Sequence, residues 1–113
     1  MDNIISWNIR GLNDPNKQED VSIFLKKQKV GLIGLRETKV RRHNEDRVAS
    51  TLFRGWQWKT NGSCCLKGRI WVAWRPKQYN VSILKITEQL ICYQVTQLAG
   101  QKKFFLTYVY GYN

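Results

Sequence analysis

Two polar residues, Asn8 and Glu37, each follow a short apolar segment that is typical of a buried strand. The apolar segment before Asn8 is residues 3–7. The apolar segment before Glu37 is residues 30–35, with Arg36 between them. Open α/β sheets place their ligand-handling side chains just beyond the carboxyl ends of their strands. A carboxylate and an amide oxygen brought together there are suitable ligands for a hard cation such as Mg²⁺. Such a cation polarises a phosphodiester and lowers the pKa of a water, so this pair favours metal-assisted phosphoryl chemistry.

Each of the two residues also has a simpler interpretation when it is taken alone. An asparagine after a strand is commonly a turn former, and a single glutamate is commonly a solvated surface charge. The functional interpretation therefore depends on both residues lying at the ends of neighbouring strands, which are about 5 Å apart in a sheet.

The elements that must position this pair form a strand–helix–strand unit. Apolar spacing predicts a helix over Lys17–Lys27 between the two strands, with Asn16 as its N-cap. A strand–helix–strand unit of this length has parallel strands. A weaker helix is predicted over 41–53. Five further strands are predicted at Trp56–Thr60, Arg69–Trp74, Val81–Ile86, Leu90–Leu98 and Lys103–Tyr110. The predicted fold class is α/β, with a βαβ start followed by an antiparallel strand meander.

Two of the later strands have distinct burial patterns. Ile91, Tyr93 and Val95 alternate with polar residues, which predicts that one face of that strand points inward. Residues 104–106 are apolar on both faces, which predicts a central strand of a layered sheet.

Length and composition indicate one ordered domain. The chain has 113 residues, 42% of them hydrophobic, which suits a single core. No apolar stretch approaches the roughly 20 residues of a membrane span, and the first residues do not resemble a signal peptide. We therefore expect a nuclear or cytoplasmic protein without a membrane partner. Three cysteines without a repeated spacing do not indicate a disulfide framework. Nothing in the sequence sets the oligomeric state.

The net charge of +11 is concentrated in the second half of the chain. Residues 1–55 carry 11 basic and 7 acidic side chains, and residues 56–113 carry 8 basic and 1 acidic. A field of this sign attracts polyanions, which makes nucleic acid the expected partner.

The candidates for contact with nucleic acid are Lys39, Arg41, Arg42, Arg69 and Arg75. The last two flank a strand that contains Trp71 and Trp74, and basic residues interleaved with aromatics can stack bases. The simpler interpretations are a solvated basic run over 39–42 and tryptophans that pack a sheet.

Three segments, in order, resemble the endonuclease/exonuclease/phosphatase superfamily: Ile4–Asn13, Leu35–Lys39 and Val109–Asn113. Residues Gly68–Pro76 also resemble a strand in the middle of that domain. The chain is most similar to the N-terminal endonuclease domain of plant LINE-type, non-LTR retrotransposon polyproteins.

The resemblance implies a two-sheet α/β sandwich flanked by helices, and cleavage of phosphate esters of DNA with Mg²⁺ or Mn²⁺. By resemblance, Asn8 matches an active-site asparagine and Glu37 matches a metal-binding glutamate with a basic neighbour, here Lys39. Tyr110 and Asn113 match the tyrosine and asparagine of a phosphate-binding loop in DNA repair members. The implied catalytic set is Asn8, Glu37, Tyr110 and Asn113, with Asn8 and Glu37 as metal ligands.

The chain also departs from the family. Arg10 stands where the repair members carry an aspartate. Family members continue for about as long again, with a Gly-Asp-x-Asn motif and a late Asp-His pair. After Arg47 the only carboxylate is Glu88. We therefore expect residues 1–113 to form a single, incomplete domain of a metal-dependent DNA endonuclease that is not catalytic by itself. The alternatives are a small basic non-catalytic nucleic-acid-binding module and a relic without function.

Overall fold

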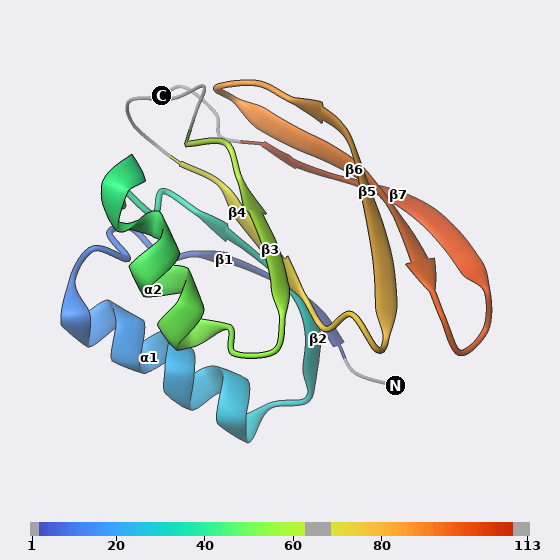
Figure 1. Cartoon of the computed structure of the whole chain (residues 1–113), viewed down its shortest axis with the longest axis horizontal. Coiled ribbons are helices and arrows are strands. Elements are labelled where there is room, and N and C mark those ends of the chain that lie inside the picture. Colours follow the sequence, from blue (N-terminus) through green and yellow to red (C-terminus); the bar gives the residue numbers. More distant parts are fainter. Residues whose placement is uncertain (1–2, 63–68, 110–113) are drawn as a thin grey trace.

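The computed structural model describes residues 3–62 and 69–109 and contains two packed sheets with two helices (Figure 1). The elements are β1 (Asn3–Asn8), α1 (Pro15–Lys27), β2 (Val30–Arg36), the 3-10 turn η1 (Arg42–Asn44), α2 (Glu45–Leu52), β3 (Gln57–Thr60), β4 (Trp71–Trp74), β5 (Tyr79–Ile86), β6 (Leu90–Gln97) and β7 (Lys102–Val109). Sheet A has the strand order β1-β2-β4-β3, and sheet B has the order β5-β6-β7. The predicted α/β class, a two-sheet sandwich with a βαβ start, is confirmed.

The βαβ unit is confirmed in its pairing. β1 and β2 are parallel, and Asn8 lies opposite Arg36 at their carboxyl ends. The other pairs of sheet A and all pairs of sheet B are antiparallel. The five later strands form the predicted antiparallel series, and it is divided between the sheets: β3 pairs with β4 in sheet A, and β5, β6 and β7 form a meander in sheet B. All four residues of β4 are buried, so this strand needs neighbours and cover on both sides.

Both helices begin at residues other than those predicted. α1 begins at Pro15 and its N-cap is Asp14, whose carboxylate accepts the Asn16 N–H at 2.9 Å. A proline at the first helical position needs no N–H partner there, which favours this earlier start. In the second helix, the predicted 41–53 segment divides into η1 and the shorter α2.

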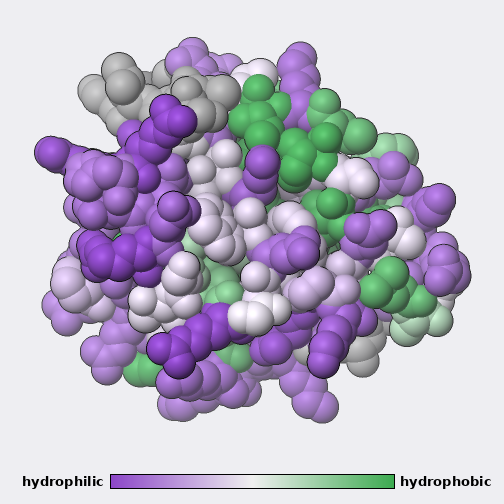
Figure 2. Space-filling view, viewed as in Figure 1, coloured by the Kyte–Doolittle hydropathy of each residue, from purple (hydrophilic) through white to green (hydrophobic). Residues whose placement is uncertain are grey.

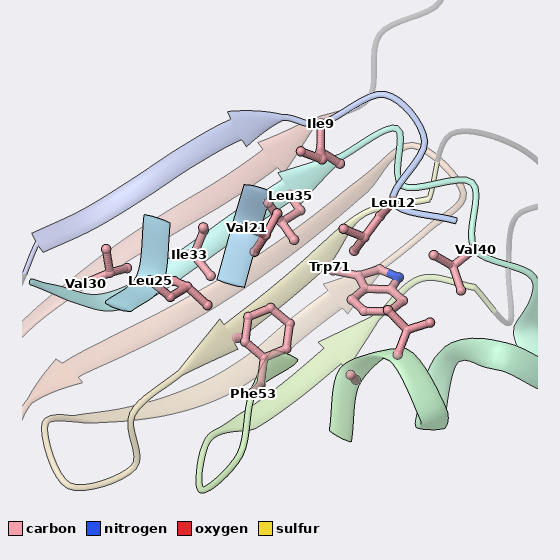
Figure 3. Packing of buried hydrophobic residues seen from close by; sticks show 13 residues of the cluster. Ile9, Leu12, Val21, Leu25, Val30, Ile33, Leu35, Val40, Phe53 and Trp71 are labelled. Carbon is pink, nitrogen blue, oxygen red and sulfur yellow. The ribbon is translucent and has the colours of Figure 1, made fainter. Parts of the chain in front are cut away.

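The two faces of sheet A bury different sets of residues. On the helix side, Ile33 and Leu35 of β2 and Trp71 of β4 pack with α1 and α2, and the close-up shows their side chains gathered there (Figure 3). On the other side, Leu32 and Val72 pack against sheet B. Strands covered on both faces have near-continuous apolar sequences, which is why residues 30–35 show no alternation.

Sheet B has one buried face. Ile91, Tyr93 and Val95 point into the core between the sheets, as their alternation predicted. The prediction that 104–106 form a central strand is wrong: β7 is at the edge of sheet B, and Phe105 is 66% exposed. No described element covers the outer face of this strand. Apolar residues on both faces therefore do not mean, in this strand, that both faces are buried. In Figure 2, hydrophobic residues gather on the upper right of the surface, over sheet B.

Among the described residues, neither helix has the length and hydropathy that a membrane crossing requires.

Candidate functional site

The carboxyl ends of β1 and β2 lie side by side and form one edge of sheet A. Backbone hydrogen bonds between the two segments continue beyond the ends of both strands. The Ile9 N–H donates to the Arg36 carbonyl at 3.1 Å, and the Gly11 N–H donates to the Glu37 carbonyl at 2.8 Å. These bonds hold the segment after Asn8 beside the segment after Arg36. The structure therefore brings the two residues singled out in the sequence, Asn8 and Glu37, to adjacent strand ends.

The backbone at this edge adopts conformations that L-residues rarely occupy. Arg10, Glu37 and Lys39 have φ angles of 47°, 56° and 57°, and Gly11 has a φ of 100°. A non-glycine residue in the left-handed region costs of order 1 kcal/mol or more, and such residues cluster at binding and catalytic sites. Three of them within one short edge indicate that tertiary packing holds the backbone of this edge in a defined conformation.

Arg10 and Glu37 form an ion pair across the two segments. Arg10 Nε lies 3.4 Å from Glu37 Oε2, and the side chains are 73% and 23% exposed. An ion pair this open to water contributes between about 0 and 1 kcal/mol, so Arg10 can exchange its partner at little cost. Sequence reasoning noted Arg10 only as a departure from the family and missed it as the partner of Glu37. The signal available in the sequence was the positive charge of Arg10, which is opposite to that of Glu37 and lies two residues after Asn8.

Further cations follow Glu37 along the chain. Lys39, Arg41 and Arg42 are all exposed in the segment between β2 and α2. Arg36 is half-buried, and its Nη1 donates to the Val109 carbonyl at 3.4 Å. The described edge therefore carries more positive than negative charge around the single carboxylate of Glu37.

Arg69 occupies an interior position. Its side chain is 8% exposed, and Nη1 donates to the Gly62 carbonyl at 3.3 Å. Its own carbonyl accepts the Thr38 N–H at 3.1 Å and the Thr38 hydroxyl at 3.3 Å. Arg69 thus joins the β4 segment to the segment after β2, and it offers little surface to a nucleic-acid strand.

Arg75 lies at the opposite edge of sheet A. Its backbone N–H donates to Gly31 at 2.8 Å, and its Nε donates to the carbonyl of Val30, the first residue of β2, at 2.9 Å. Because β2 has seven residues, Arg75 and Glu37 are separated by about 20 Å. Arg75 therefore cannot serve the same site as Glu37.

The tryptophans of β4 are core residues. Trp71 is fully buried on the helix face, where it stacks on Trp58 with 6.2 Å between the ring centroids. Trp74 is buried on the other face with the residues of sheet B. The hypothesis that these two rings stack bases is wrong, and the simpler interpretation as sheet packing is confirmed.

Glu45 is a buried carboxylate that sequence reasoning missed. It is the first residue of α2 and lies against Gly62, where an added Cβ would be 2.5 Å from Glu45 Oε1. Its Oε2 has no hydrogen-bond partner among the described residues. Nothing in the polar stretch around Glu45 distinguishes it from a surface glutamate, so no sequence signal indicated its burial.

The described residues contain no group of three or more His, Cys, Asp or Glu side chains that could hold a metal ion. Mg²⁺ keeps several waters and takes only one or two carboxylates from a protein, so Glu37 and Asn8 would supply at most two of its oxygen ligands. In the structure, Arg10 contacts the Glu37 carboxylate. Tyr110 and Asn113, the predicted phosphate-loop residues, lie outside the described residues.

No protein-family model matches the sequence, and no curated protein matches it. Several solved structures resemble the fold. One is the 3' phosphatase NExo from Neisseria bound to product DNA hairpin, with 17% identity over 81% of this chain and 37% of that chain, at a TM-score of 0.59. Another is the AP endonuclease LMAP from Leishmania major, with 14% identity over 97% of this chain and 40% of that one, at a TM-score of 0.67. A third is the catalytic domain of Xenopus laevis APE2, with 15% identity over 96% and 44% of the two chains, at a TM-score of 0.56.

The chain spans about two fifths of the length of these structures. Over that part, its two sheets and two helices have the fold of AP endonuclease and phosphatase structures.

Proposed function

We propose that this chain is the first part of a nuclease-type domain from a LINE-type retrotransposon protein, and that its described edge binds the phosphate backbone of DNA. The single observation that carries the proposal is the strained edge where Arg10, Glu37 and Lys39 lie beside the end of β1. The net charge of +11 and the fold shared with DNA-processing enzymes support it. The retrotransposon origin rests on the sequence resemblance alone.

The cations at this edge supply the attraction for phosphate. Lys39, Arg41 and Arg42 are exposed, and contacts of this kind position a protein on a duplex without reading its sequence. Asn8 is also exposed at the end of β1, and its amide can donate to a phosphate oxygen. Arg10 adds a guanidinium, which can pair with phosphate through two parallel N–H donors.

Glu37 sets the position of Arg10. In the free protein its carboxylate contacts Arg10 Nε and keeps the guanidinium at the edge of the sheet. When a phosphate approaches, Arg10 changes partner, because the exposed pair contributes at most about 1 kcal/mol. The same carboxylate repels phosphate, so Glu37 limits the affinity of the edge.

Hydrolysis requires more than this edge holds. An attacking water must be activated by a base, and the developing charge must be stabilised. The described edge has one carboxylate, and Arg10 contacts it. We therefore assign binding to these residues and expect no cleavage by this chain alone. The second candidate function is non-catalytic nucleic-acid binding. It uses the same exposed cations but requires no catalytic residues beyond those described.

The test uses the purified chain with a fluorescent 20-base-pair DNA duplex, titrated at several salt concentrations. The variant Lys39→Gln/Arg41→Gln/Arg42→Gln should bind more weakly, with a salt slope lower by about 2.7 if three phosphate contacts are lost. Its matched control is Lys59→Gln/Lys85→Gln/Lys103→Gln, which removes three exposed cations from β3, β5 and β7.

Nicking of supercoiled DNA with Mg²⁺ is measured alongside. Equal binding by the two triple variants would refute the assignment of phosphate contact to this edge. Nicking by the wild-type chain that Glu37→Ala abolishes would overturn the assignment of inactivity.

A further inference from the structure

A cavity of about 570 Å³ lies at the edge of sheet A opposite Glu37. The carboxyl-terminal ends of α1 and α2 form two of its walls, through Leu25 and Leu52. The remaining wall includes Trp56, before β3, and Arg75, after β4. Its volume lies in the range of roughly 300–1,000 Å³ that is usual for sites of small ligands.

Arg75 is held rigidly at this cavity. Its Nε donates to the Val30 carbonyl at 2.9 Å, and its guanidinium carbon lies 4.7 Å from the centroid of the Trp56 ring. Trp56 in turn packs on Phe53, with 5.6 Å between the centroids. A cation fixed in this way loses little conformational freedom when a ligand binds, which favours affinity.

The positive charge of the side chains that line the cavity exceeds the partial negative charge of the two helix ends. Lys26, Arg54 and Arg75 all line it, and among its described lining residues none carries a carboxylate. The carboxyl end of each helix bears roughly half a negative charge. Two helix ends therefore offset about one positive charge, whereas Lys26 and Arg54 alone bring two, both on exposed side chains.

More cations lie next to the lining residues in the sequence. Lys27 is the last residue of α1, Lys29 lies two residues later, and Lys77 lies two residues after Arg75; all three are exposed. In Figure 2 the lower rim of the molecule, below the helices in the view of Figure 1, is mostly hydrophilic.

We propose that this cavity binds the phosphate group of a nucleotide, either free or within a nucleic-acid strand. Lys26, Arg54 and Arg75 pair with the phosphate, and the apolar walls contact the sugar and base. The site is separate from the edge that carries Glu37, because the length of β2 lies between them. The proposal therefore goes beyond the proposed function and does not depend on it.

The test compares Lys26→Gln/Arg54→Gln with the matched control Lys59→Gln/Lys85→Gln. All four side chains are exposed, and both variants lose two charges, so thermal unfolding checks that each remains folded. The probes are ATP and a 12-nucleotide single-stranded DNA, each titrated into the whole chain. We expect binding about tenfold weaker than in the control, and for the DNA a salt slope lower by about 1.4.

The two probes distinguish the sources of the phosphate. Weaker ATP binding supports a free nucleotide as the ligand, and weaker binding of the DNA alone supports a strand. If the cavity variant binds both probes as the control does, the inference is overturned. If the Lys39 triple variant then still loses DNA binding, the proposed function stands without this site.

Discussion

Gly34, in the middle of β2, packs directly against β7 of the other sheet, and replacing it with alanine should destabilise the fold. An added Cβ would overlap the ring of Tyr108 on β7. The ring has no easy way to withdraw, because it stacks on Tyr93 with 5.8 Å between the centroids. Its hydroxyl also donates to the Ile5 carbonyl of β1 at 3.1 Å.

The magnitude follows from these contacts. Overpacking a core costs about 1–3 kcal/mol, and loss of the Tyr108 hydrogen bond costs about 1 kcal/mol more. Alanine also reduces the entropy of the unfolded chain, which offsets about 0.4–1 kcal/mol. The free energy of unfolding of Gly34→Ala should therefore fall by about 1–3.5 kcal/mol, a shift in Tm of roughly 4–20 °C for a domain of this size.

Urea denaturation monitored by tryptophan fluorescence measures the effect. Gly100→Ala is the matched control, because the atom nearest to its added Cβ, Gln97 Oε1, is 3.9 Å away. A second series introduces Gly34→Ala into Tyr108→Val, where the ring is absent. There the alanine should cost less than about 0.5 kcal/mol, since the coupling between contacting residues disappears with the contact.

If Gly34→Ala unfolds within about 0.5 kcal/mol of the wild-type chain, the packing of β7 on β2 is refuted. An equal cost of the alanine with and without the Tyr108 ring would also refute it, since the loss would then not come from this contact.

The remaining predictions concern the site, alkaline stability and the first helix. Arg10→Gln should weaken DNA binding several-fold, whereas Glu37→Gln should strengthen it; each should change stability by less than about 1 kcal/mol, because their pair is exposed. A loss of binding in Glu37→Gln would contradict this arrangement. Burial raises the pKa of the Tyr93 hydroxyl, so above pH about 10 the unfolded chain releases this proton first and stability falls as pH rises. Urea midpoints at pH 8 and pH 11 should therefore differ more for the wild type than for Tyr93→Phe. Asp14→Ala should cost about 0.5–2 kcal/mol in urea unfolding as the loss of the N-cap of α1, and Asn16→Ala, the cap expected from sequence, should cost less.

Local sequence patterns were sufficient to locate the strands and helices and to place Asn8 and Glu37 together. Period and turn residues depend on neighbours within about ten residues, and a strand–helix–strand sequence of about 30 residues has parallel strands as a rule, so all three can be read from the chain itself. The error at the start of α1 has the same local origin, because Asp14 and Asn16 are both good N-caps and only the choice of Pro15 as the first helical residue separates them.

Tertiary structure decided what each side chain contacts. Arg69 and Arg75 look equivalent beside the tryptophan strand, yet one is buried against Gly62 and the other lies at the far edge beside Val30. Phe105 is exposed because it lies on the outer face of β7, which no described element covers, while its neighbours Phe104 and Leu106 face the core. The pairing of Arg10 with Glu37 joins residues 27 positions apart, and it exists because β1 and β2 are parallel neighbours. A one-dimensional pattern specifies which residues share a face, whereas strand order and the packing of sheet on sheet determine which of those faces meet.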